Sequence, residues 1–188
     1  MWAKNVIIRT MGTGIAVLVI GLLSACDNSE ETHASHANHA EHGSQDLYLS
    51  EVPLHTNRMP APEISAGGWV GEEVQLQKSR GKVILLDFWA TWCPPCRAYL
   101  PHTESTWKKY RDKGLVVVGV HDTMGSKGAA GYMKEHNFTF PTGLDDGRTS
   151  QAYNVVAIPT YYLIDKEGNI AWGPEHAPPT NEIIEMLL

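Results

Sequence analysis

Two cysteines lie two residues apart in the stretch ILLDFWATWCPPCRAYLP, which covers residues 84–101. The pair consists of Cys93 and Cys96, and the chain contains one further cysteine, Cys26. A CxxC pair can hold a metal, anchor a haem or exchange electrons with other thiols. The residues around the pair distinguish these three chemistries.

A structural zinc site needs four ligands, commonly two CxxC pairs or one pair with histidines at fixed spacing. The chain has no second pair, and the nearest histidines that follow, His102 and His121, lack that spacing. Covalent haem attachment needs CxxCH, whereas Arg97 follows the second cysteine here. Thiol–disulfide exchange needs only one reactive thiol at a helix start and a second thiol one turn further along. The motif therefore favours exchange.

The two thiols are predicted to differ in reactivity because of the helix that follows them. Residues 94–113 have a helical pattern that starts with two prolines, and Gly114 is its predicted stop. A helix N-terminus carries about half a positive charge, which favours a thiolate there. We therefore expect Cys93 to be the exposed attacking nucleophile and Cys96 to be the more buried resolving thiol.

The elements that position the pair alternate between strands and helices. Residues 82–90 form a nearly continuous apolar run, as expected for a strand buried on both faces, and the cysteines follow its carboxyl end. Further strands are expected at 74–76, 115–121, 160–165 and 170–173, and further helices at 126–137, within 146–155 and at 180–188. This order predicts an α/β sheet with helices on both faces, and chemistry at the carboxyl ends of its strands.

The first 25 residues have the pattern of a secretory signal. Lys4 and Arg9 precede an apolar run at residues 11–23, which is shorter than the roughly 20 residues that span a bilayer. The sequence LLSAC then resembles the lipobox of bacterial lipoproteins, in which the cysteine is lipidated and becomes the first mature residue. We predict a lipoprotein signal peptide at residues 1–25 and lipidation of Cys26. An ordinary signal peptide and an uncleaved anchor are the alternatives.

Lipidation would leave Cys93 and Cys96 as the only free thiols, able to pair with each other or with another molecule. Their compartment would then be outside the cytoplasm, where disulfides persist. The formal charge of −6 becomes −8 on removal of residues 1–25, which hold two cations and no acid. With no basic patch in the sequence, nucleic acid is not an expected partner.

A histidine-rich segment separates the signal from the fold, which is expected to begin near Met59. Residues 27–46 have no large apolar side chain, so residues 26–58 are predicted to be a disordered tether and 59–188 the folded domain. Histidines recur at every third position, a spacing that lines one edge of a polyproline II helix, and imidazole binds copper and zinc. A plain tether and weak metal binding are both open for His33, His36, His39 and His42.

Three motifs together resemble a known family. The string ILLDFWATWCPPC, the proline five residues after the second cysteine and VVAIPTYYLID at residues 155–165 are similar to extracytoplasmic thioredoxin-fold proteins of the TlpA/ResA family. The resemblance implies a thioredoxin-like fold with a central mixed β-sheet flanked by helices, and no cofactor. It implies exported protein thiols or disulfides and a membrane electron donor of the DsbD/CcdA type as partners. Cytochrome c maturation is one role found in the family.

The resemblance also assigns roles to residues outside the CxxC pair. Pro159 matches the family's cis-proline, which with Ile158 borders the substrate groove opposite the cysteines. Trp92 is expected to form a wall of that groove. Asp87 matches the buried acid of thioredoxin, which moves a proton for the resolving cysteine, whereas TlpA and ResA proteins often have asparagine or another residue there. Tyr99 departs from the family, which often has glutamate there.

These features together predict a lipid-anchored thiol–disulfide oxidoreductase on the periplasmic side of a bacterial inner membrane. The reducing direction is favoured, because two prolines between the cysteines offer no amide donors to stabilise the Cys93 thiolate. A copper-binding chaperone or metalloenzyme assembly factor, which would use the CPPC motif and the histidine tract, is the alternative.

Overall fold

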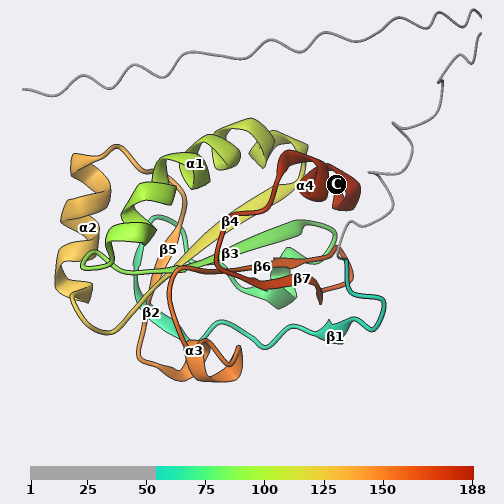
Figure 1. Cartoon of the computed structure of the whole chain (residues 1–188), viewed down its shortest axis with the longest axis horizontal. Helices are drawn as coiled ribbons and strands as arrows, with labels where there is room; N and C mark the ends of the chain where they lie inside the picture. The colour runs from blue at the N-terminus through green and yellow to red at the C-terminus, as the bar shows by residue number, and fades with distance from the viewer. Residues whose placement is uncertain (1–53) are drawn as a thin grey trace, which may run out of the picture. The chain divides into compact units, whose positions relative to one another are not determined.

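The computed structural model describes residues 54–188, which form a mixed sheet with helices on both faces (Figure 1). The strands are β1 (Met59–Pro60), β2 (Ala66–Val70), β3 (Val83–Trp89), β4 (Leu115–His121), β5 (Thr142–Asp145), β6 (Thr160–Ile164) and β7 (Asn169–Glu175). The helices are α1 (Pro94–Tyr110), α2 (Ser126–Glu135), α3 (Arg148–Ala152) and α4 (Asn181–Leu187), with 3₁₀ helices at Leu76–Ser79 and Arg111–Lys113.

The strand order in the sheet is β1-β7-β6-β3-β4-β5-β2. Strand β3 lies at its centre, parallel to β4 on one side and antiparallel to β6 on the other. Strands β4 and β5 are parallel, while the remaining pairs are antiparallel. The expected α/β fold with a central mixed sheet and flanking helices is therefore confirmed.

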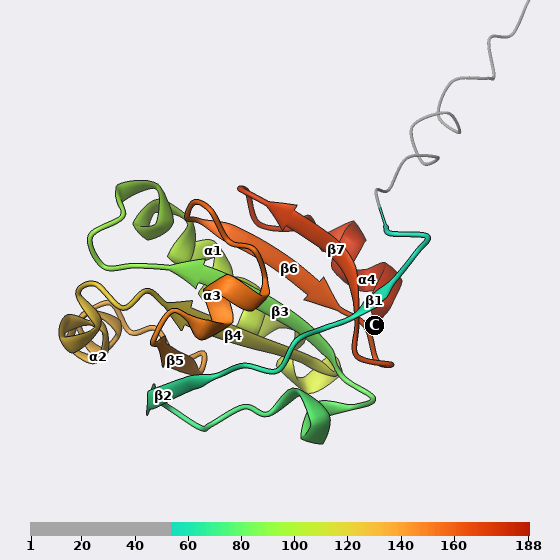
Figure 2. The same ribbon diagram turned by 90° about the horizontal axis from the view of Figure 1, so that it is seen from below.

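Strand β3 is buried along its whole length because helices cover both faces of the sheet. Helices α1 and α4 lie on one face and α3 on the other, as the two perpendicular views show (Figures 1 and 2). Successive side chains of a strand point to opposite faces. The β3 side chains Val83, Leu85 and Trp89 accordingly belong to the core that contains the cysteines, and Ile84, Leu86 and Phe88 belong to the other core. By the same alternation Asp87 faces α1.

Helix α1 presents a buried stripe to this sheet face. Its buried residues include Cys96, Leu100, Thr103 and Tyr110, whose spacing of three, four and seven residues follows one side of a helix. The 3₁₀ turn that follows ends at Gly114, whose φ of 100° is left-handed, as at many helix ends. The helix and its stop lie where the sequence predicts them.

The prediction of a strand at residues 74–76 is wrong. Leu76 begins a 3₁₀ helix instead, and the carboxylate of Glu63 accepts hydrogen bonds from the amides of Leu76, at 3.1 Å, and Gln77, at 2.9 Å. These bonds satisfy the first amide groups of the 3₁₀ helix, which have no partner within it. The edge strand beside β5 is β2, which lies earlier in the chain, and β1 forms the opposite edge.

Several expectations fall on residues outside the described part of the chain. These are the signal at 1–25, the lipidation of Cys26, most of the tether, and the histidines at 33, 36, 39 and 42. Between residues 54 and 188, none of the helices combines the length and the apolar character that crossing a membrane requires.

Candidate active site

A disulfide joins Cys93 to Cys96, with an S–S distance of 2.07 Å and a Cα–Cα distance of 5.3 Å. Strand β3 ends at Trp89, and Cys93 is the N-cap residue of α1. The backbone amide of Cys96 points to the Cys93 Sγ at 3.2 Å. The pair therefore lies at the carboxyl end of the central strand and at the positive end of a helix dipole.

The expectation that Cys93 is exposed is wrong for the disulfide form. Cys93 is 3% exposed and Cys96 is 1% exposed, and both belong to the core beneath α1. The Cys93 Sγ lies 3.8 Å from the carbonyl oxygen of Ile158, so the loop before β6 covers it. In the disulfide form the sulfur of Cys93 therefore packs against the chain and is shielded from solvent.

The two prolines after Cys93 were expected to leave its sulfur without amide donors, and this holds for residues 94 and 95 but not for residue 96. Both are proline and have no N–H group. The amide of Cys96 nevertheless points to the Cys93 sulfur, so one donor remains at the N-terminus of α1. A Cys93 thiolate would retain this one charge-assisted hydrogen bond.

Asp87 is fully buried in the middle of β3. Its Oδ2 accepts a hydrogen bond of 2.8 Å from the hydroxyl of Thr103, and its Oδ1 has no partner among the described residues. Burial raises the pKa of Asp87 from 3.8 to about 7, and the bond from Thr103 partly opposes this. Thr103 is seven residues after Cys96 on α1, so the acid and the inner cysteine face the same space between helix and sheet.

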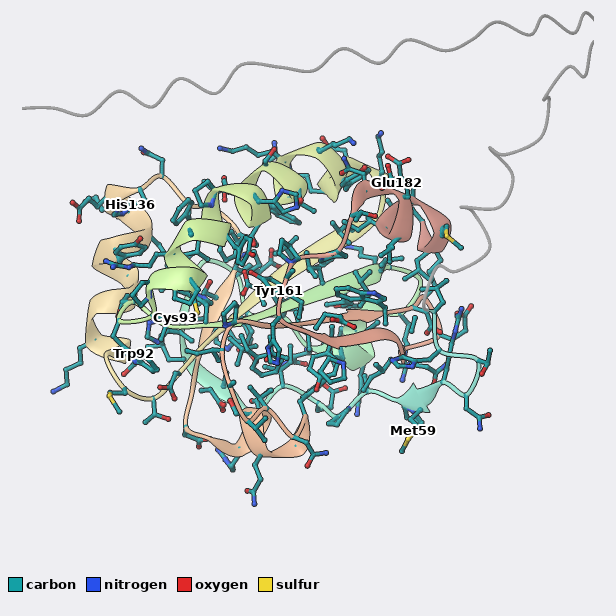
Figure 3. All side chains as sticks on the ribbon, viewed as in Figure 1. Met59, Trp92, Cys93, His136, Tyr161 and Glu182 are labelled. Carbon is teal, nitrogen blue, oxygen red and sulfur yellow. A yellow bond between two sulfur atoms is a disulfide. The ribbon has the colours of Figure 1, made fainter. Side chains whose placement is uncertain are left out.

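A surface groove lies between Trp92, the residue before Cys93, and the loop before β6. The Ile158–Pro159 peptide bond is cis, as the family resemblance implies. Trp92, labelled beside Cys93 in Figure 3, is 49% exposed. Its Nε1 donates a hydrogen bond of 3.0 Å to the carbonyl oxygen of Met124. A pocket of about 220 Å³ is lined by residues that include Trp92, Asp122, Val155, Val156 and Ile158. Val156 is 94% exposed, so this rim offers apolar contact area to an incoming chain.

Two polar residues near the site were not identified from the sequence. Tyr161 pairs with Asp87 across β3 and β6, and its buried hydroxyl has no partner in the described part of the chain. Burial and the Asp87 charge both raise the pKa of Tyr161. His121, at the end of β4, accepts a hydrogen bond from the amide of Thr91. Tyr161 and His121 each contact a residue of the site that is far away in the sequence, so local motifs do not reveal them.

Metal ligation was an open alternative for the histidine tract, which lies outside the described residues. Within residues 54–188, no group of three or more histidine, cysteine, aspartate or glutamate side chains is placed to hold a metal ion.

The chain is similar to named proteins over the part that forms this fold. The family model of the AhpC/TSA family matches residues 58–173. The thioredoxin-like protein YneN of Bacillus subtilis is 40% identical over 113 residues, which are 58% of this chain and 66% of YneN. The thiol-disulfide oxidoreductase ResA of Bacillus thuringiensis is 30% identical over 111 residues, 58% of this chain and 64% of ResA. The chain thus spans slightly less than two thirds of each relative.

Solved structures agree with the sequence comparison. A thiol:disulfide interchange protein of the thioredoxin family from Chlorobium tepidum superposes with a TM-score of 0.62 at 27% identity, covering 71% of this chain and 98% of that chain. A putative thiol:disulfide interchange protein DsbE from the same organism has a TM-score of 0.56 at 31% identity, covering 68% and 89%. Because the family match spans more than half of the chain, the protein belongs to the AhpC/TSA family and has a thioredoxin-like fold.

Proposed function

We propose that this protein is a thiol–disulfide oxidoreductase whose redox centre is the Cys93–Cys96 pair. The observation that carries the proposal is a disulfide at the N-terminus of α1 with a buried acid, Asp87, beneath the same helix. The relatives named thiol-disulfide oxidoreductase and thiol:disulfide interchange protein support it.

In the reduced protein, the Cys93 thiolate attacks a substrate disulfide and displaces one substrate thiolate. This step forms a mixed disulfide between Cys93 and the second substrate sulfur. Cys96 then loses its proton and attacks the Cys93 sulfur, which breaks the mixed disulfide and releases the second substrate thiolate. Two electrons have moved to the substrate, and the protein is left with the Cys93–Cys96 disulfide of the described structure.

Asp87 is the proposed acceptor for the Cys96 proton. With a pKa raised to about 7 by burial, its carboxyl is close to evenly divided between its two forms at neutral pH. A base with a pKa near the working pH combines availability with driving force. The hydrogen bond from Thr103 fixes one carboxylate oxygen and leaves the other, Oδ1, without a protein partner in the described residues.

The groove beside the pair is the proposed contact for the substrate chain. Trp92 and the loop that contains Ile158 and Pro159 border it, and Val156 extends its apolar rim. A partner that lays an extended segment beside Pro159 would bring its own disulfide within reach of the Cys93 sulfur.

The proposed setting is the periplasmic face of a bacterial inner membrane, with lipid on Cys26 as the anchor. The reducing direction is proposed, with a membrane electron carrier of the DsbD/CcdA type restoring the dithiol. The support for the setting is the signal-like sequence before Cys26, and for the direction it is the absence of amide donors at Pro94 and Pro95.

The function is tested by catalysed reduction of a protein disulfide with dithiothreitol as the electron source. We expect turnover by the wild type and its loss in Cys93→Ser, because the attacking sulfur is gone. Cys26→Ser is the matched control, since it removes a cysteine that is not part of the pair, and it should retain the wild-type rate. Equal rates for the wild type and Cys93→Ser would contradict the proposal.

A further inference from the structure

A buried histidine lies beside the segment that carries the redox pair. His121 is the last residue of β4 and pairs with Trp89, the last residue of the parallel neighbour β3. Its side chain is 0% exposed and meets the Trp89 indole edge-on, with ring centroids 4.7 Å apart. The imidazole therefore lies at the carboxyl ends of β3 and β4, where the chain leaves β3 and enters the CxxC turn.

Two hydrogen bonds determine the protonation state of this ring. The amide of Thr91 points to Nε2 at 3.0 Å, so Nε2 has to accept. The carbonyl oxygen of Asp122 lies 2.7 Å from Nδ1, so Nδ1 has to donate. A neutral imidazole has one donor and one acceptor nitrogen, and an imidazolium has two donors. The two partners therefore fit the neutral ring with its proton on Nδ1, and they do not fit the charged ring.

The bond to Thr91 connects β4 to the segment before the nucleophile. Thr91 is two residues before Cys93, and the next residue, Trp92, is held by the Met124 carbonyl from the same loop after β4. A second link is the amide of Asp122, which donates to the Trp89 carbonyl oxygen at 2.9 Å. Three hydrogen bonds thus join the start of the CxxC turn to the end of β4 and the loop after it. Of these, the bond to His121 is the one that protonation of a side chain would break.

We infer that His121 is a positioning residue: its neutral imidazole holds Thr91, and thereby Trp92 and Cys93, in the geometry for exchange, and its protonation releases this segment. The inference rests on the proposed function for its effect on exchange, whereas the hydrogen bond itself is independent of that function. It predicts a loss of reactivity at acid pH beyond the loss due to the cysteines and Asp87.

The surroundings of the ring favour the neutral form. Two neighbours of His121 are uncharged: Trp89 on β3, which its ring contacts, and Leu144, its register partner on β5. Asp122 is the charged group in the described chain that acts on the ring. Burial lowers the pKa of His121, while the carbonyl and the charge of Asp122 oppose that effect. Above its pKa the ring holds Thr91, and below it a second N–H would face the Thr91 amide.

Two substitutions separate positioning from packing. His121→Gln offers an amide oxygen to Thr91 and does not titrate in this range, whereas His121→Phe retains a ring but no acceptor. The matched control is His102→Gln, which changes an exposed histidine on α1. Thermal unfolding of each variant would establish that the fold is retained.

The direct readout is the Thr91 amide signal in ¹H–¹⁵N NMR spectra of the oxidised protein, recorded from about pH 8 down to about pH 4. We expect a titrating shift in the wild type and in His102→Gln, and a flat response in His121→Gln and His121→Phe. A wild-type Thr91 signal that does not follow pH would overturn the inference, whatever the exchange activity is found to be.

The second readout is the rate of exchange of the reduced protein with a small disulfide reagent. His121→Phe should react about 2- to 10-fold more slowly near neutral pH, the range of one net hydrogen bond. His121→Gln should match the wild type near neutral pH and exceed it progressively in acid. A Gln-to-wild-type ratio that stays constant with pH would overturn the inference. If the wild type itself fails to exchange, the proposed function fails, and the Thr91 signal still decides the role of His121.

Discussion

Asp87 should make the folded protein less stable as the pH rises towards neutral, and Asp87→Asn should remove this dependence. The buried carboxyl keeps its proton up to a pKa of about 7 in the folded chain, whereas its ordinary value is 3.8. Between these values the folded state binds more protons than the unfolded state. The free energy of unfolding then falls with rising pH through this window and levels off above about pH 7.

The size of the effect follows from the two pKa values. A tenfold difference in acidity is worth about 1.4 kcal/mol, so the interval from 3.8 to about 7 corresponds to about 4 kcal/mol. Between about pH 5 and about pH 8 the wild type should lose about 3 kcal/mol of this free energy of unfolding. Asparagine is near-isosteric and stays neutral in both states, so Asp87→Asn should gain this amount over the wild type.

The assay is urea unfolding of the oxidised protein at about pH 5 and about pH 8, without reductant. Asp112→Asn is the matched control, because its side chain is 90% exposed and the same chemical change is made on the surface. The wild type should lose stability relative to Asp87→Asn across this range, and Asp112→Asn should follow the wild type. A wild-type curve parallel to that of Asp87→Asn would refute the assignment of a buried, titrating acid.

Three further outcomes follow from the site. Cys96→Ser should accumulate mixed disulfides through Cys93, visible on non-reducing gels, and equal trapping by Cys93→Ser would contradict the proposed roles. Cys26→Ser should lose lipid and membrane association in cell fractions; retention of both would remove the proposed anchor. Thr103→Val removes the donor to Asp87, so the midpoint of the pH-dependent stability loss should rise by up to about one pH unit, and an unchanged midpoint would show that this bond does not tune the acid.

The centre of the fold is predictable from the sequence because its signals are local. Strands β3 and β4 are nearly continuous apolar runs, whereas a strand with one exposed face would alternate apolar and polar residues. The helical pattern after Cys93 ends at a glycine. The edge of the sheet is not predictable in this way. Strand β2 contains two glycines and, among the described strands, pairs with the short β5 alone, so its register depends on residues far away in the sequence, such as Asp145 opposite Ala66.

The site residues likewise fall into those that local sequence signals reveal and those that only the fold brings together. The cysteines are close in sequence, and Thr103 follows Cys96 by seven residues on the same helix, a spacing that could have identified it. The bond from Thr91 to His121 joins residues 30 positions apart, and only the parallel pairing of β3 with β4 brings them together. The burial of Cys93 likewise depends on the loop at Ile158, which no pattern around the CxxC motif predicts.

The most direct test of the reductase account is the reduction potential of the Cys93–Cys96 pair. The helix N-terminus and the Cys96 amide favour the Cys93 thiolate and so an oxidant, whereas Pro94 and Pro95 withhold two donors. Equilibration with glutathione, followed by fluorescence of the tryptophans near the pair, would measure the balance. We predict a potential near that of thioredoxin, about −270 mV, rather than that of the strong oxidant DsbA, about −120 mV. A value above about −170 mV would contradict the account and make the protein a disulfide donor.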